Sequence, residues 1–125
     1  MYDIKIKSNF SAAHNLKDYK GKCERLHGHN WIVEAVFSYE AVDKSGLAID
    51  FKDAKEALGA VLEKLDHAYL NDVTALGGIN PTSENIAKSI YDDLKKKVKE
   101  LKSVSVWENE NSCATYSEGW GLREA

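Results

Sequence analysis

The sequence predicts an α+β fold, in which a four-stranded antiparallel sheet carries two helices on one face. Two long segments near the N-terminus alternate apolar and polar residues, two segments with helical apolar spacing follow, and two shorter alternating segments come last. The expected order is therefore ββααββ. The 125 residues suffice for one hydrophobic core, and we expect a single domain over 1–125.

The first two predicted strands rest on period-two alternation. Residues 2–14 place apolar side chains at even positions, and this series ends in His14. Residues 27–39 place them mainly at odd positions, and that series begins with His27 and His29. Since successive side chains of a strand point to opposite faces, each segment has one apolar face that bears histidine at one end.

These three histidines are predicted to meet at one end of the sheet. If the two strands pair antiparallel through the connection 15–26, His14 lies beside His27 and His29. Three imidazoles with an open fourth position are typical of a catalytic zinc site. The alternative is three unrelated strand-end histidines, and their convergence on one apolar face favours the metal site.

The composition argues against several classes of protein. Hydrophobic residues make up 43% and charged residues 30%, which is typical of a globular and soluble chain. The net charge of -3 argues against nucleic acid as the main partner. Neither an apolar stretch of membrane-spanning length nor a signal-peptide pattern is found, so we expect a cytoplasmic protein without a membrane partner.

The two cysteines, Cys23 and Cys113, are expected to be reduced, because the sequence shows no export signal. Cys23 lies just upstream of His27, where a nearby metal would favour the thiolate. Cys113 falls in the predicted last strand, and we expect it to be an ordinary small core residue.

The two helices are predicted from their first residues and their apolar stripes. Asp50 is the expected N-cap of a helix over roughly 51–65, and Thr82-Ser83-Glu84 opens the second. Residues 70–80 between them are expected to form a loop, with Gly77-Gly78 as its hinge. The stripes consist of Ala54, Ala57, Leu58, Val61, Leu62 and Leu65 in the first helix and Ile86, Ala87, Ile90, Leu94, Val98 and Leu101 in the second.

Asp66 and His67 directly follow the first predicted helix. A carboxylate beside an imidazole can form a proton relay. Alternatively, a histidine at this place interacts with the C-terminal end of the helix dipole. The residues alone favour the second interpretation.

The last two strands add a carboxylate to the sheet. Val104, Val106 and Glu108 share one face of the third strand, and residues 113–116 form the fourth. A polar side chain at the end of an apolar face indicates a pocket there. A small sheet also has edge strands to cover, so pairing with further copies of the chain is physically reasonable.

The sequence resembles the 6-pyruvoyltetrahydropterin synthase and 6-carboxytetrahydropterin synthase superfamily. Six short motifs carry the resemblance, and together they reach to about Tyr116, nearly the whole chain. In chain order they are Phe10-Ser11-Ala12-Ala13-His14, Cys23-x-x-x-His27-Gly28-His29, Asp50-Phe51, Leu65-Asp66-His67, Pro81-Thr82-Ser83-Glu84-Asn85 and Trp107-Glu108.

This resemblance implies the tunnelling fold, in which subunits join their sheets into an oligomeric barrel and two trimers stack as a homohexamer. It implies 7,8-dihydroneopterin triphosphate, a pterin, as the substrate in a pocket between subunits. The residue roles that it implies are zinc ligands for His14, His27 and His29, proton acceptor for Cys23, relay for Asp66 and His67, ring anchor linked to that relay for Glu108, and ring contacts for Thr82 and Ser83.

The resemblance also bears on the product. Three residues separate Cys23 from His27, which resembles the 6-carboxytetrahydropterin synthases of queuosine precursor synthesis. Glu24 instead resembles relatives that release a 6-hydroxymethyl pterin, and Asn109 stands where the family often has threonine. Alternatives are therefore the 6-pyruvoyl and 6-hydroxymethyl activities, a pterin-binding module without turnover, and a zinc-stabilised structural domain.

The connection 15–26 is basic. Lys20, Lys22 and Arg25 lie there, beside the expected metal pocket. They are candidates for contacts with the triphosphate, or are ordinary surface residues.

Overall fold

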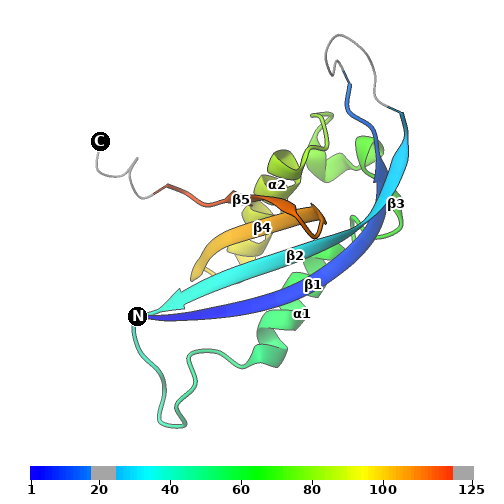
Figure 1. Cartoon of the computed structure of the whole chain (residues 1–125). Coiled ribbons are helices and arrows are strands. Elements are labelled where there is room, and N and C mark those ends of the chain that lie inside the picture. Colours follow the sequence, from blue (N-terminus) through cyan, green and yellow to red (C-terminus); the bar gives the residue numbers. More distant parts are fainter. Residues whose placement is uncertain (18–24, 120–125) are drawn as a thin grey trace.

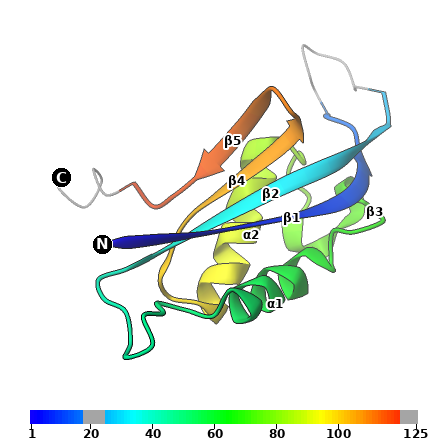
Figure 2. The ribbon, with the colours of Figure 1, turned by 60° about the horizontal axis from the view of Figure 1, so that its bottom comes forward.

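The computed structural model describes residues 1–17 and 25–119 and shows one sheet packed against two helices (Figure 1). The sheet has five strands in the order β3-β1-β2-β4-β5. Figure 2 shows both helices against the same face. The elements are β1 (Tyr2–His14), β2 (His27–Tyr39), α1 (Phe51–Leu62), β3 (Ala68–Tyr69), the short 3₁₀ helices η1 (Leu70–Asp72) and η2 (Thr74–Leu76), α2 (Ser83–Lys97), β4 (Leu101–Asn109) and β5 (Ser112–Tyr116).

The predicted α+β architecture is confirmed, with one addition. The four predicted strands are present, and each neighbouring pair among them is antiparallel. The addition is β3, which pairs parallel with β1 at Ala12 and Ala13. Two residues are too few to leave a periodic signal, so the sequence did not reveal this strand. Of the helices in the described ranges, none is long and apolar enough to cross a membrane.

The pairing of β1 with β2 brings the histidines together at one end of the sheet. The register runs from Tyr2 opposite Tyr39 to His14 opposite His27. Four residues in from this end, Phe10 lies opposite Trp31, and their rings stack with centroids 5.8 Å apart. Both rings are fully buried, so this end of the sheet rests on a rigid aromatic layer.

The helices begin where predicted and end earlier. The Asp50 side chain accepts from the Lys52 N–H, and the Thr82 hydroxyl accepts from the Asn85 N–H, so both N-caps are formed. However, α1 ends at Leu62 rather than near residue 65. Leu101, predicted in the second helix, is the first residue of β4, because the chain turns between 98 and 100.

The prediction for Cys113 was wrong. Cys113 pairs with Trp107 across β4 and β5, and its side chain is exposed. It lies on the alternate set of positions from Ala114, which faces the helices opposite Val106. The strand was correctly identified, but its short alternation did not reveal which face carries the helices.

Candidate functional site

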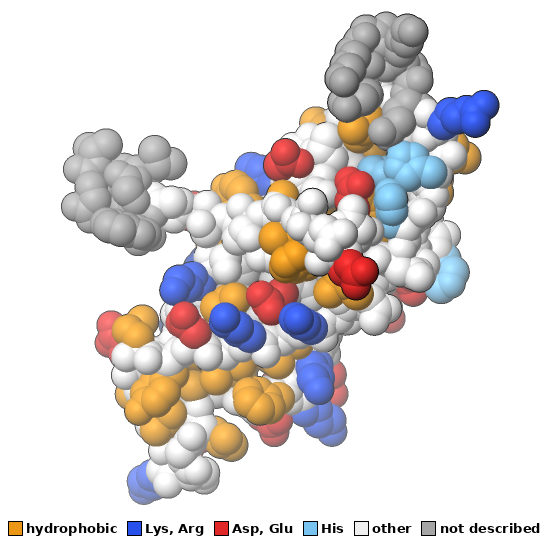
Figure 3. Space-filling model, in the orientation of Figure 1, with side chains coloured by type: hydrophobic (Ala, Val, Ile, Leu, Met, Phe, Trp, Pro, Cys, Tyr) orange, Lys and Arg blue, Asp and Glu red, His pale blue; other side chains and the backbone are white. Residues whose placement is uncertain are grey.

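Three histidine side chains meet at the end of the β1–β2 pair. Ligand nitrogens of His14, His27 and His29 all lie within 4.8 Å of one another. His14 is buried, and the other two are partly exposed. Figure 3 shows histidine side chains gathered near this end of the molecule, with a carboxylate beside them. The predicted convergence is therefore present in the structure.

Backbone carbonyls fix the roles of the ring nitrogens in two of the three histidines. His14 Nδ1 lies 2.7 Å from the Pro81 carbonyl oxygen, and His27 Nδ1 lies 2.8 Å from that of Arg25. A carbonyl oxygen only accepts hydrogen bonds, so both Nδ1 atoms carry the proton and, in the neutral rings, both Nε2 atoms are left with a lone pair.

These two Nε2 atoms face each other at 3.0 Å. Two lone pairs at this distance repel unless a cation or a shared proton lies between them. A divalent metal ion satisfies this requirement without charging an imidazole, and neutral Nε2 is a usual metal ligand. The chemistry of His14, His27 and His29 therefore fits a bound metal ion.

Glu108 lies next to the three histidines, on the side of α2. Its Oε2 is 3.6 Å from His29 Nε2, and its Oε1 accepts a hydrogen bond of 3.1 Å from the Ser83 hydroxyl. Ser83 is the first residue of α2, so the helix N-terminus and β4 together hold this carboxylate. It borders a pocket of about 270 Å³ lined by Ser83, Glu84, Glu108, Asn109, Ser112, Cys113 and Ala114.

The pocket contains one carboxylate that the sequence did not reveal as part of a site. Glu84 is in the first turn of α2, where an acidic residue complements the helix dipole. A glutamate at this position therefore does not by itself indicate a binding site. By contrast, the Thr82 hydroxyl is occupied as the helix N-cap and Thr82 does not line this pocket. The expected contact between Thr82 and a substrate ring stays a prediction.

The side chains of Asp66 and His67 are in polar contact. His67 Nδ1 lies 3.2 Å from Asp66 Oδ2, while Asp66 Oδ1 accepts from the Ser11 N–H at 2.9 Å. That N–H holds the pKa of the Asp66 carboxyl below its usual range. Since α1 ends at Leu62 and His67 has a φ of 56°, the pair lies beyond the helix, and the helix-dipole interpretation does not hold.

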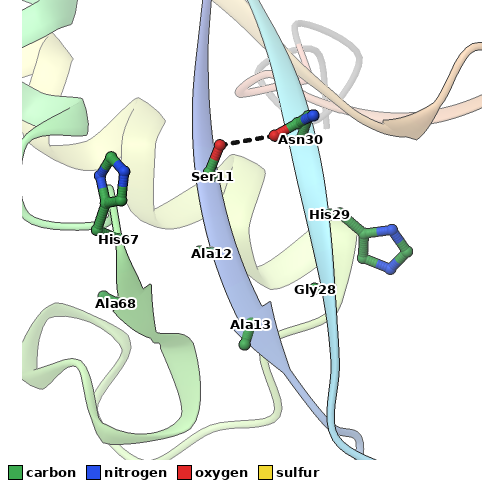
Figure 4. A pocket seen from close by; sticks show the side chains of 8 residues that line it. All are labelled: Ser11, Ala12, Ala13, Gly28, His29, Asn30, His67 and Ala68. Atoms are coloured by element: carbon green, nitrogen blue, oxygen red, sulfur yellow. Dashed lines mark hydrogen bonds between the residues drawn. The ribbon is translucent and has the colours of Figure 1, made fainter.

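This pair does not face the histidine cluster. His67 precedes β3, and β1 lies between β3 and the strand of His29. Figure 4 shows His67 to one side of β1, with the ring of His29 pointing away from it beyond β2. A strand spacing of about 4.8 Å gives a separation near 10 Å between the two backbones. The His67 side chain and the ring of His29 therefore lie on opposite sides of the β1–β2 pair.

The shallow pocket beside His67 has a volume of about 400 Å³. Its lining comes from neighbouring strands and consists of Ser11, Ala12, Ala13, Gly28, His29, Asn30, His67 and Ala68. The Ser11 hydroxyl donates to Asn30 Oδ1 within this lining (Figure 4).

Some predicted site residues lie outside the described ranges. These are Cys23, Glu24, Lys20 and Lys22. Arg25 is described, and its carbonyl holds the His27 ring.

Comparisons with known proteins agree on one family. A family model described as 6-pyruvoyl tetrahydropterin synthase matches residues 3–119. A 6-carboxy-5,6,7,8-tetrahydropterin synthase of Synechocystis is 38% identical over 122 residues, covering 93% of each chain. A 6-pyruvoyl tetrahydrobiopterin synthase of Dictyostelium discoideum is 35% identical, covering 86% of this chain and 89% of its own. The structure of 6-pyruvoyl tetrahydropterin synthase from Caenorhabditis elegans superimposes with a TM-score of 0.84 at 28% identity, covering 94% of this chain and 96% of that one.

Proposed function

This chain belongs to the 6-pyruvoyl tetrahydropterin synthase family, and we propose that it converts 7,8-dihydroneopterin triphosphate to 6-carboxy-5,6,7,8-tetrahydropterin with loss of acetaldehyde and triphosphate. The observation that carries this proposal is the convergence of His14, His27 and His29 beside Glu108. The choice of product is supported by the name of the Synechocystis relative and by the spacing from Cys23 to His27. Queuosine precursor synthesis is the pathway that this product implies.

We propose that the metal is Zn²⁺, held by Nε2 of each of the three histidines. Three neutral imidazoles with a free fourth position suit this ion. When bound, it would supply Lewis acidity toward hydroxyl groups of the substrate side chain. Glu108 then accepts hydrogen bonds from donors of the pterin ring, and Ser83 fixes the direction of that carboxylate.

Proton transfer is assigned to Cys23 and to the pair of Asp66 and His67. The Asp66 carboxylate holds the proton of His67 Nδ1, which leaves His67 Nε2 to exchange a proton with the substrate. The exposure of the imidazole leaves this nitrogen within reach of another molecule. Cys23 is the proposed acceptor of a substrate proton near the metal.

The proposed active site requires residues from more than one copy of the chain. His67 lies on the β3 side of the β1–β2 pair, whereas Glu108 and the pocket that it lines lie on the β4 side. The pair of one subunit would therefore complete the metal pocket of another. We propose the homohexamer of two stacked trimers, with subunit sheets joined as a barrel.

The deciding experiment incubates the zinc-loaded protein with 7,8-dihydroneopterin triphosphate and identifies the pterin by mass spectrometry. The 6-carboxy product is expected. A 6-pyruvoyl or 6-hydroxymethyl product would show that the protein has the corresponding sister activity. If the substrate binds but stays unchanged, the protein is a pterin-binding module without turnover.

Chelation separates the catalytic metal from a structural one. The hydrophobic core consists of apolar side chains from the sheet and both helices, and of the three histidines only His14 is buried beside it. Removing zinc is therefore expected to stop turnover while circular dichroism of the fold persists, whereas a structural zinc domain would unfold.

A further inference from the structure

Two asparagine side chains pair with the backbone that follows His14. The Asn15 N–H donates to Asn71 Oδ1 at 3.0 Å, and Asn71 Nδ2 donates to the Asn15 carbonyl at 2.7 Å. The Lys17 N–H donates to Asn80 Oδ1 at 2.8 Å, and Asn80 Nδ2 donates to the Lys17 carbonyl at 2.8 Å. Each carboxamide thus exchanges two hydrogen bonds with the N–H and carbonyl of one residue, as a residue of a neighbouring antiparallel strand would.

Only the second of these asparagines belongs to the turn that contacts His14. Asn80 precedes Pro81, whose carbonyl oxygen lies 2.7 Å from His14 Nδ1. The carbonyl of Asn80 itself accepts from Asn85 Nδ2 at 2.8 Å and from the Thr82 N–H at 2.9 Å. The turn is therefore fixed to the start of α2 on one side and, through the Asn80 carboxamide, to the exit of β1 on the other.

We propose that Asn80 is a positioning residue, which holds the Pro81 carbonyl against His14 and so keeps His14 in the tautomer that leaves Nε2 unprotonated. This inference rests on the proposed function of His14 as a metal ligand. Outer groups that fix the tautomer of a ligating histidine typically contribute 10- to 100-fold in metal affinity. In this chain the outer group is the backbone carbonyl of Pro81, which no substitution removes. The role can be tested instead by substituting Asn80, whose side chain holds that carbonyl in place.

Asn71 provides a matched control. It makes the same pair of hydrogen bonds to the same segment, two residues closer to His14 than those of Asn80. It lies in η1, away from the turn at Pro81. If mere anchoring of the segment decided the geometry of His14, Asn71→Ala would act as strongly as Asn80→Ala.

The test uses the metal-free full-length chain with ¹⁵N-labelled histidine, followed by titration with Co²⁺ as the probe. In the wild type and in Asn71→Ala, His14 is expected to show one tautomer, protonated at Nδ1. Asn80→Ala is expected to mix the tautomers and to bind Co²⁺ about 10- to 100-fold more weakly. Asn80→Asp keeps the acceptor for Lys17 but loses the donor, and an intermediate loss is expected.

Each contrary result has a distinct meaning. A single Nδ1-protonated tautomer with unchanged Co²⁺ affinity in Asn80→Ala would overturn the role of Asn80 and leave the metal site intact. Equal losses in Asn71→Ala and Asn80→Ala would overturn it as well. A folded wild type that binds no Co²⁺ would overturn this inference together with the proposed metal site. Should Asn80→Ala fail to fold, Asn80→Asp carries the same comparison.

Discussion

The histidine cluster and the Asp66–His67 pair differ in how they are held. In the cluster, backbone carbonyls from outside the two strands fix two of the rings, and His14 is buried on Trp31. His67 is held by its own neighbour and by the backbone of Ser11, and its imidazole is 83% exposed. Rings that are held in place around one buried histidine suit permanent metal ligands. An exposed imidazole suits a group that acts on a molecule bound at another subunit. Variants that break one region should therefore spare the other.

The largest effect is expected from His29→Ala. It removes one of three ligands, so metal binding and turnover should both fall to background. His29 is partly exposed at the end of β2, which keeps the cost in folding small. Metal content by elemental analysis, together with product formation, measures the effect. Wild-type turnover in a metal-free variant would contradict the role of the cluster.

His67→Asn should have a smaller effect on turnover and none on the metal. Loss of a positioned acid or base typically lowers the rate by about 10²- to 10⁴-fold. Asparagine is chosen because it tolerates the positive φ of this residue. Bound zinc should match that of the wild type. A variant that loses zinc along with activity would show that the two regions are not independent.

Mixing the two variants sharpens the comparison further. If His67 of one subunit completes the metal pocket of another, oligomers assembled from His29→Ala and His67→Asn chains contain some sites with both groups intact. Co-refolded mixtures are therefore expected to regain activity that neither variant has alone. Activity that stays at the sum of the separate variants would place both groups in one chain's site.

The two regions also differ in how far the sequence predicts them. Alternation assigns His14, His27 and His29 to one face, and antiparallel pairing brings strand ends together, so the cluster follows from the residue pattern alone. The direction of His67 depends on one left-handed residue and on pairing of β3 over two residues, which leave no periodic signal. The exposure of Cys113 was missed for a related reason, since five residues of β5 do not show which face the helices cover.

Ser83→Ala tests the support of Glu108 within the first region. It removes the hydroxyl that donates to Glu108 Oε1 at 3.1 Å. One such bond is worth about 1 kcal/mol, so KM is expected to rise roughly fivefold while kcat changes little. Ser112→Ala is the control, because Ser112 lines the same pocket from β5. Equal changes in the two variants would mean that Ser83 does not orient the carboxylate.

The smallest effect concerns the second region and depends on pH. The Ser11 N–H lowers the pKa of the Asp66 carboxyl, so the folded state favours the carboxylate. The resulting stabilisation is present above the unfolded pKa of about 4 and is lost as pH falls through the lower folded value. Urea unfolding of the wild type and Asp66→Asn should therefore differ more at pH 7 than in strong acid. Because the group is solvent-exposed, only a small difference is expected. A difference that persists unchanged into strong acid would show that it does not come from the charge of the Asp66 carboxylate.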